Sequence, residues 1–134
     1  MIFVLYDLEN KITGDKTMIS PLSAATTALS AFNKKMSSTA NNIANVISDG
    51  YKKSRVNLQE GANGGVTAQV QQIDTPGPLK ETIQNGEVVE TESSNVDLAE
   101  ELTEMIPTKA AYSANLKSIR TQEEMMGSLL DILG

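Results

Sequence analysis

An apolar seven-residue repeat runs through residues 97–133 of this 134-residue chain and is typical of one long amphipathic helix. One position of the repeat contains Leu98, Met105, Tyr112, Ile119, Met126 and Leu133. The alternate position contains Leu102, Leu116 and Leu130, with Lys109 and Glu123 between them. A helix of this size is about 55 Å long. It cannot be buried in so small a domain, so much of its apolar stripe must contact something else.

Local signals define the start of this helix and one irregularity within it. Asp97 is a suitable N-cap, and Glu100 follows three residues later, as in a capping box. Pro107 removes a helix hydrogen bond and crowds the preceding turn, so we expect a kink near residues 103–107 or a helix of two segments. The two charged residues of the repeat are interpreted as a solvated edge; the alternative is that they set register against a partner's charges.

Residues 20–47 are predicted to form another amphipathic helix, with Ser20 as its N-cap and Pro21 at its first position. One seam position contains Leu22, Leu29, Met36 and Ile43. The interleaved position contains Ala25, Phe32, Thr39 and Val46. The other faces carry mostly serine, threonine and alanine, which let further helices approach closely. We favour packing against helices of several chains, with packing inside one domain as the alternative.

The segment between the helices differs in composition. Asp49-Gly50 is a turn pair that ends the first helix, and residues 61–65 (GANGG) form a second turn. Residues 66–70 alternate between apolar and polar, and residues 86–91 are typical of another short strand. These patterns predict two or three short strands. The glycine-rich turn lacks the lysine and hydroxyl residue of a phosphate-binding loop.

Composition excludes several functions. A net charge of −6 and a pI of about 4.6 argue against nucleic acid as a partner. The sequence contains no cysteine and no histidine, so thiol nucleophiles, disulfides and the commonest general base are absent. It has no apolar run of membrane-spanning length, which predicts no membrane insertion, and residues 2–6 are too short for a signal-peptide core. We therefore predict that the chain is not an enzyme and has no cofactor or metal.

Charged residues form two opposite runs. The basic run is Lys52, Lys53 and Arg55. The acidic residues near the start of the second helix are Glu87, Glu90, Glu92, Asp97, Glu100, Glu101 and Glu104. Both runs are interpreted as solvated, with head-to-tail attraction between copies as the alternative.

The sequence NNIANVISDGYKKSRV, residues 41–56, crowds three asparagines into the end of the first helix. It resembles the N-terminal signature of the flagellar axial proteins, which comprise the rod, hook and hook-associated families. The matching positions are Asn41, Asn42, Ala44, Asn45, Gly50, Tyr51 and Lys52. Residues 93–133 are similar to the C-terminal signature of the same families. The matching positions there are Ser94, Asn95, Val96, Asp97, Leu98, Glu101, Met105, Tyr112, Ala114, Asn115, Ile119, Met126 and Leu130.

The resemblance implies a fold and a domain organisation. The expected fold is mainly α with a small β insert: two long terminal helices forming an antiparallel coiled-coil-like pair, with a short β-hairpin region between them. Residues 1–17 are interpreted as an N-terminal extension, disordered or a short strand, and 18–47 as the N-terminal axial helix. Residues 48–93 form the loop and small β region, and 94–134 form the C-terminal axial helix, which packs with 18–47 as one unit.

The resemblance also implies a function. The short middle segment is most similar to that of a short proximal-rod protein, so the chain is expected to polymerise into the hollow, periplasm-spanning rod of the flagellar basal body. Its expected partners are copies of itself, other axial proteins and the flagellar type III export apparatus, which exports it without a cleavable signal peptide. The predicted assembly seam comprises Leu22, Leu29, Phe32, Met36, Ile43, Leu98, Leu102, Met105, Tyr112, Leu116, Ile119, Met126 and Leu130.

Other interpretations stay open at this point. Within the family, the alternative is a truncated hook-type or hook-associated protein. From another class, the alternative is a soluble coiled-coil adaptor or secretion chaperone, which predicts a discrete dimer. The side-chain amides of Asn41, Asn42 and Asn45 are predicted to hold the junction between helix and loop, with ordinary C-terminal capping as the alternative.

Overall fold

A computed structural model describes residues 21–61 and 64–133 of the chain. Its elements are α2 (Pro21–Ala44), β1 (Ser54–Glu60), β2 (Val66–Gln72), β3 (Leu79–Gln84), β4 (Glu87–Glu92) and α3 (Leu98–Leu133). The predictions for residues 1–17 and for the cap at Ser20 lie outside the described residues. Neither described helix contains a stretch that is both long and apolar enough to cross a bilayer.

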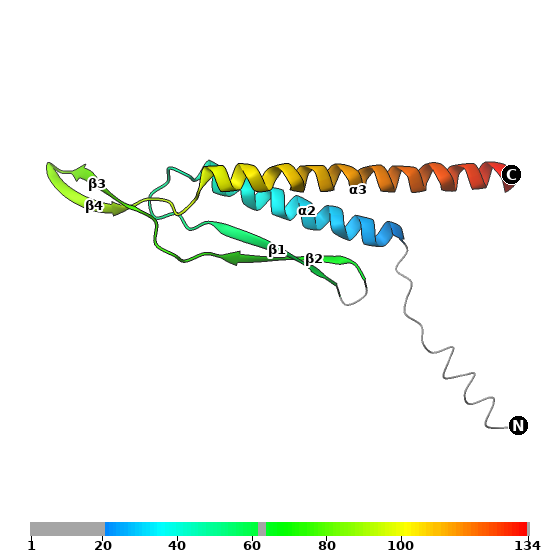
Figure 1. Ribbon diagram of the computed structural model, residues 1–134, viewed down its shortest axis with the longest axis horizontal. Helices are drawn as coiled ribbons and strands as arrows, with labels where there is room; N and C mark the ends of the chain where they lie inside the picture. Colours follow the sequence, from blue (N-terminus) through cyan, green and yellow to red (C-terminus); the bar gives the residue numbers. More distant parts are fainter. Residues whose placement is uncertain (1–20, 62–63, 134) are drawn as a thin grey trace, which may run out of the picture.

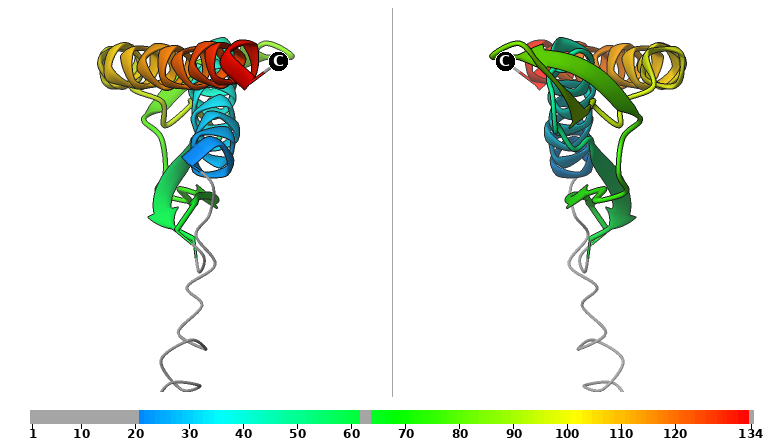
Figure 2. Two further views of the ribbon diagram at one scale, coloured as in Figure 1. Left: turned by 90° about the vertical axis from the view of Figure 1, so that its right-hand side faces the viewer. Right: turned by 90° about the vertical axis from the view of Figure 1, so that its left-hand side faces the viewer.

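The elements form an elongated molecule (Figure 1). The helices run antiparallel and diverge from the end where α2 stops and α3 begins, and α3 extends well past the start of α2 (Figures 1 and 2). α2 lies between α3 and the β1–β2 hairpin, with which it is also in contact. The β3–β4 hairpin projects beyond the shared end of the helices. The helix α2 is therefore the element that contacts both α3 and the β1–β2 hairpin.

The four strands form two separate antiparallel hairpins. β1 pairs with β2 from Ser54↔Gln72 to Glu60↔Val66, and β3 pairs with β4 from Leu79↔Glu92 to Gln84↔Glu87. β2 and β4 confirm the strands predicted at residues 66–70 and 86–91. β1 and β3 lie outside the two ranges that were predicted as strands.

The predicted coiled-coil-like helix pair with one short β-hairpin region is wrong. The middle of the chain contains two hairpins, and the contact between the helices does not follow the apolar seam. On α3 the residues buried toward the body are Glu101 and Thr108, whereas Leu102 and Leu116 are exposed. α2 packs on both α3 and the β1–β2 hairpin, so its apolar side chains are divided between two neighbours and no continuous two-helix seam forms.

Pro107 does not interrupt α3. The helix continues from Leu98 to Leu133 with Pro107 inside it, and Figure 1 shows it straight. Pro107 is exposed, and so is Thr103, whose carbonyl loses its helix donor. That carbonyl can bond to water instead, which removes much of the cost of the missing hydrogen bond. The predicted kink or two-segment helix is therefore wrong.

The core is thin and largely polar. Among the described residues, the buried apolar side chains are Ala31 and Val56. The buried polar ones are Thr39, Asn42, Ser94, Glu101 and Thr108. Specific hydrogen bonds must therefore define this fold to a greater extent than in a domain with a thick apolar interior.

Candidate functional site: the junction and the outer face of α3

The junction is the region where residues 42–54, 73–78 and 92–97 meet, and Asn42 lies at its centre. The Asn42 side chain is 1% exposed. Its Nδ2 donates to the Ser54 carbonyl at 2.8 Å, and its Oδ1 accepts from the Ser54 N–H at 2.9 Å. The Tyr51 hydroxyl donates to the same Oδ1 at 3.3 Å, and the Ser38 hydroxyl donates to the Ser54 carbonyl at 3.1 Å. The amide therefore ties the last turn of α2 to the start of β1.

The other two asparagines of the group have different roles. The Asn45 Nδ2 donates to the Asn41 carbonyl at 2.9 Å, and its Oδ1 accepts from the Ser48 hydroxyl at 3.1 Å. The Asn41 side chain is exposed. The prediction that an amide holds the junction is thus confirmed for Asn42, whereas Asn45 provides the ordinary capping of the helix end.

Asn95 joins three chain segments at the other side of the junction. Its Oδ1 accepts from the Lys53 N–H at 2.7 Å, and its Nδ2 donates to the carbonyls of Ile73 at 2.7 Å and Thr75 at 2.8 Å. Its backbone N–H donates to the Tyr51 carbonyl at 3.2 Å. The entrance to α3 is therefore connected to the residues that flank β1 and β2.

Two glycines and one cap complete the backbone of the junction. Gly50 has φ +68° and donates to the Glu92 carbonyl at 2.8 Å, in a conformation that favours glycine. Gly77 donates to Glu92 Oε1 at 2.7 Å and lies against the backbone of residues 93–94. Asp97 Oδ1 accepts from the N–H groups of Ala99 and Glu100, at 2.9 and 3.2 Å, which confirms Asp97 as the N-cap.

The basic and acidic runs pair within one chain. Lys53 Nζ lies 2.9 Å from Glu100 Oε2, and Arg55 pairs with both Glu100 and Glu104. Lys52 pairs with Glu92 across the junction. The interpretation of the basic run as simply solvated is wrong, because residues 53 and 55 lie beside the first two turns of α3 in the same chain. Attraction between copies stays a prediction for the acidic residues outside these pairs.

These contacts lower the pKa values of two carboxyl groups. The hydrogen bond from Lys52, with a second from the Gly77 N–H, lowers the pKa of Glu92 below the ordinary glutamate value of 4.5. The hydrogen bond from Lys53, followed by that from Arg55, lowers the pKa of Glu100 in the same direction. Both groups are partly solvated, so each ion pair adds modestly to stability.

The lowered pKa values predict loss of stability in acid. A carboxyl group whose folded pKa is depressed stabilises the fold above its unfolded pKa and stops doing so as the pH falls through the folded pKa. We expect the urea midpoint of the intact chain to fall between about pH 5 and pH 3, and the Glu92→Gln variant to show a weaker pH dependence. Circular dichroism at a series of pH values measures both. Glu87→Gln, which removes an exposed hairpin carboxylate, serves as the control, and equal slopes for Glu92→Gln and the intact chain would contradict the prediction.

The Asn42→Ala variant should lower the free energy of unfolding by about 2 kcal/mol, because it leaves the partly buried Ser54 N–H without its side-chain acceptor and removes one of two side-chain donors to the Ser54 carbonyl. The matched control is Asn41→Ala, at the exposed neighbouring position, which should change stability by no more than about 0.5 kcal/mol. Urea unfolding of both purified variants tests the difference. Equal stabilities would show that the amide does not hold the junction.

A polar line on α3 faces α2. Glu101, Thr108, Asn115 and Gln122 recur every seven residues and are buried or half-buried. Asn115 Nδ2 donates to the Ala25 carbonyl at 2.6 Å, which attaches the middle of α3 to the first turns of α2. Glu101 is 1% exposed, and its Oε1 has no hydrogen-bond partner among the described residues. The helix pair is thus joined by polar contacts at defined positions.

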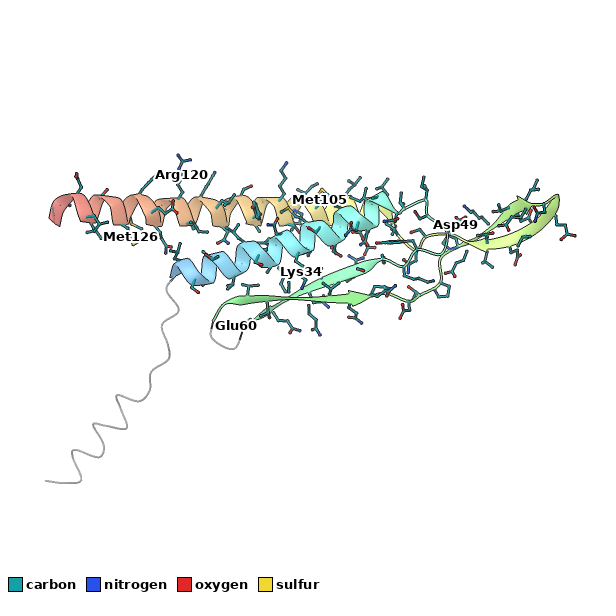
Figure 3. The ribbon with its side chains drawn as sticks, turned by 180° about the vertical axis from the view of Figure 1, so that it is seen from behind. Lys34, Asp49, Glu60, Met105, Arg120 and Met126 are labelled. Atoms are coloured by element: carbon teal, nitrogen blue, oxygen red, sulfur yellow. The ribbon has the colours of Figure 1, made fainter. Side chains whose placement is uncertain are left out.

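The predicted seam residues divide into two groups. The half-buried ones are Leu22, Leu29, Phe32, Met36, Ile43, Met105, Tyr112 and Ile119. The exposed ones are Leu98, Leu102, Leu116, Met126 and Leu130. We define the outer face of α3 by Leu102, Ile106, Lys109, Leu116 and Arg120, which lie about one helical turn or a multiple of it apart, beside the α2 contact. Figure 3 shows Arg120 pointing away from α2.

The signature residues occupy three places. The junction contains Asn42, Asn45, Gly50, Tyr51, Lys52, Asn95, Val96 and Asp97. Asn115 lies at the other end of the helix pair, whereas Asn41, Ala44 and Leu98 are exposed. The sequence patterns did not identify Ser54, Gly77 or Glu92 as junction residues. For Gly77 a signal was present, because it is the glycine between two prolines in residues 75–78 (TPGP).

Concave surface lies beside α2. Two open cavities of about 200 and 220 Å³ lie between α2 and the β1–β2 hairpin, and both are lined by Lys34. Their other lining residues include the small hydroxyl side chains Thr27, Ser30, Ser37 and Ser38. Within residues 21–61 and 64–133, no group of three or more acidic side chains is placed to hold a metal ion.

Comparison with known proteins identifies the C-terminal part of the chain. Residues 90–132 match the family model described as flagellar basal body rod FlgEFG protein, C-terminal. The flagellar basal-body rod protein FlgG of Buchnera aphidicola subsp. Schizaphis graminum (strain Sg) is 53% identical over 38 residues, which are 28% of this chain. The match spans only 15% of the length of that relative. The part of the chain that contains the entrance to α3 and most of the helix is therefore similar to the C-terminal part of flagellar basal-body rod proteins.

Proposed function

We propose that this chain is a structural subunit of the flagellar basal-body rod, which polymerises through surfaces on its two helices into a hollow helical drive shaft. One observation carries the proposal: several large apolar side chains of the long helix face solvent in the single chain. Leu102 and Leu116 are both close to half exposed, and Leu130 is 71% exposed. Burying such side chains against neighbouring copies stabilises an assembly by about 25 cal/mol per Å² of apolar surface.

The junction gives each copy the same shape. Asn42 connects α2 to the start of β1, and Asn95 connects the entrance to α3 to residues 53, 73 and 75, through hydrogen bonds of 2.7 to 2.9 Å. A polymer needs subunits that present identical surfaces, because small angular errors add up along a helical array. We assign Asn42 and Asn95 to this role, with residues 18–47 and 94–134 acting as one axial unit around the middle segment 48–93.

The proposal includes the surroundings of the chain. It places the protein in the periplasm-spanning rod of the basal body, in contact with copies of itself and with other axial proteins. It also assigns export to the flagellar type III apparatus. The family match at residues 90–132 supports this location.

Electron microscopy of basal bodies from a strain that lacks the gene tests the proposal. We expect inner rings without a rod, and restoration of the rod when the intact chain is expressed. Complete rods and hooks in the absence of the gene would contradict it. In that case, sedimentation of the purified chain separates a discrete dimer, as expected of an adaptor, from a subunit that polymerises.

A further inference from the structure

The β3–β4 hairpin stands apart from the rest of the chain. Its strands contact each other and no other described helix or strand. Figure 1 shows the hairpin projecting beyond the helices, and Asn85 (φ +54°) with Gly86 (φ +87°) closes it in a turn of the type I′ class. A two-stranded hairpin on its own is marginal in water. A surface that covers it in the assembled protein would remove this weakness.

One face of the hairpin combines apolar and acidic side chains. The register places Ile83 opposite Val88 and Glu81 opposite Glu90, with Leu79 on the same face. Leu79, Ile83 and Val88 are 66–75% exposed. Carboxylates directly opposite each other on paired strands repel. Among the described residues, the salt bridges of the hairpin involve Lys80 and Glu92 at its base, and not this acidic pair.

The outer face of α3 is apolar and basic, which complements the apolar and acidic face of the hairpin. Its exposed apolar residues Leu102, Ile106 and Leu116 alternate with Lys109 and Arg120. Residues 105–122 contain three basic residues and no acidic residue. Arg120 pairs within the helix with Glu124 at 3.4 Å, in a largely exposed pair that is weak and easily exchanged.

We propose that the β3–β4 hairpin of one copy lies on the outer face of α3 of the next copy, with Glu81 and Glu90 beside Lys109 and Arg120. The lengths agree, since a six-residue strand is about 20 Å long and the helix rises about 21 Å from Leu102 to Leu116. The two surfaces differ, so the contact is head to tail and generates an open array. The inference rests on the proposed function and names the surfaces that join two copies.

Site-specific cross-linking tests the contact directly, because the sequence contains no cysteine. A full-length Ile83→Cys chain is mixed with a Leu102→Cys, Ile106→Cys or Leu116→Cys chain and oxidised. The control partner is Ala114→Cys, at an exposed position away from the outer face of α3. Docked pairs have effective concentrations near the millimolar range, so we expect at least one outer-face partner to give mixed disulfide on the order of tenfold faster than the control.

Charge reversal shows whether the cross-link depends on the proposed contact or on random collision, and it tests the contact separately from the rod function. The Glu81→Lys, Glu90→Lys double change should reduce the cross-linking rate to that of the control, and Lys109→Glu, Arg120→Glu in the partner should restore it. Equal rates for the outer-face and control partners, or a rate that charge reversal leaves unchanged, would overturn the inference. Normal rods built from the charge-reversed hairpin would also overturn it while leaving the rod function intact.

Discussion

Replacing Gly77 by alanine should lower the free energy of unfolding by about 3 kcal/mol, the largest effect expected of any single methyl group in this chain. A Cβ at this position would lie 2.1 Å from the Ser93 carbonyl oxygen and 2.9 Å from the Ser94 carbonyl carbon. Both neighbours are backbone atoms and cannot rotate away. The segment is also fixed by the hydrogen bond from Gly77 to Glu92 at 2.7 Å and by that from Ser93 to Pro78 at 2.9 Å.

The control for this prediction is another glycine. Gly127 lies inside α3, and nothing stands within 4 Å of the position of its Cβ. Gly127→Ala should therefore increase helix stability by about 0.5–1 kcal/mol, because alanine loses less backbone freedom in a helix. Urea unfolding and far-ultraviolet circular dichroism measure both variants. Gly77→Ala chains as stable as the intact protein would show that the strand ends at the junction can move apart.

The sequence predicts the local elements of this protein better than their contacts. Asp97 identifies the start of α3 because capping depends on residues only two or three positions away. The alternation in residues 66–70 identifies β2 for the same reason. β3 was missed because its residues, LKETIQ, are mostly polar, although the Asn85-Gly86 pair that follows it is a strong hairpin signal.

The seven-residue repeat gave the period of α3 but not the line along which α2 lies. Met105, Tyr112 and Ile119 flank the contact as predicted residues of the seam. The contact line itself contains the polar residues Glu101 and Thr108, which no apolar pattern selects. The apolar stripe is therefore divided between the chain's own partner helix and solvent. Only the position of α2 reveals this division, and α2 is also packed against the β1–β2 hairpin.

The junction could be predicted only in part, for the same physical reason. Crowded asparagines at a helix end indicate side-chain hydrogen bonding, and Asn42 meets that expectation. Asn95, however, bonds to residues 20 to 42 positions away along the chain. The pairing of Arg55 with Glu104 spans a similar distance. Partners so far apart follow from the path of the whole chain and not from local spacing.

A single charge on the outer face of α3 should abolish rods without unfolding the subunit. Leu116 is 44% exposed in the single chain, so Leu116→Asp should reduce the stability of the isolated subunit by no more than about 1 kcal/mol. In the assembled rod the same position is expected to be buried against a neighbouring copy. An unpaired carboxylate there costs several kcal/mol, and the cost recurs at every contact along the polymer.

The measurement combines electron microscopy of basal bodies with circular dichroism of the purified chain. In a strain that lacks the gene, we expect Leu116→Asp chains to give inner rings without rods, although their helix content equals that of the intact chain. Leu116→Met, which conserves volume and apolar character, should restore rods because it leaves the buried surface nearly unchanged. Normal rods from Leu116→Asp chains would mean that the outer face of α3 stays in water after assembly. The apolar side chains on that face would then stabilise no contact between copies, and the surfaces that hold the rod together would have to lie elsewhere on the molecule.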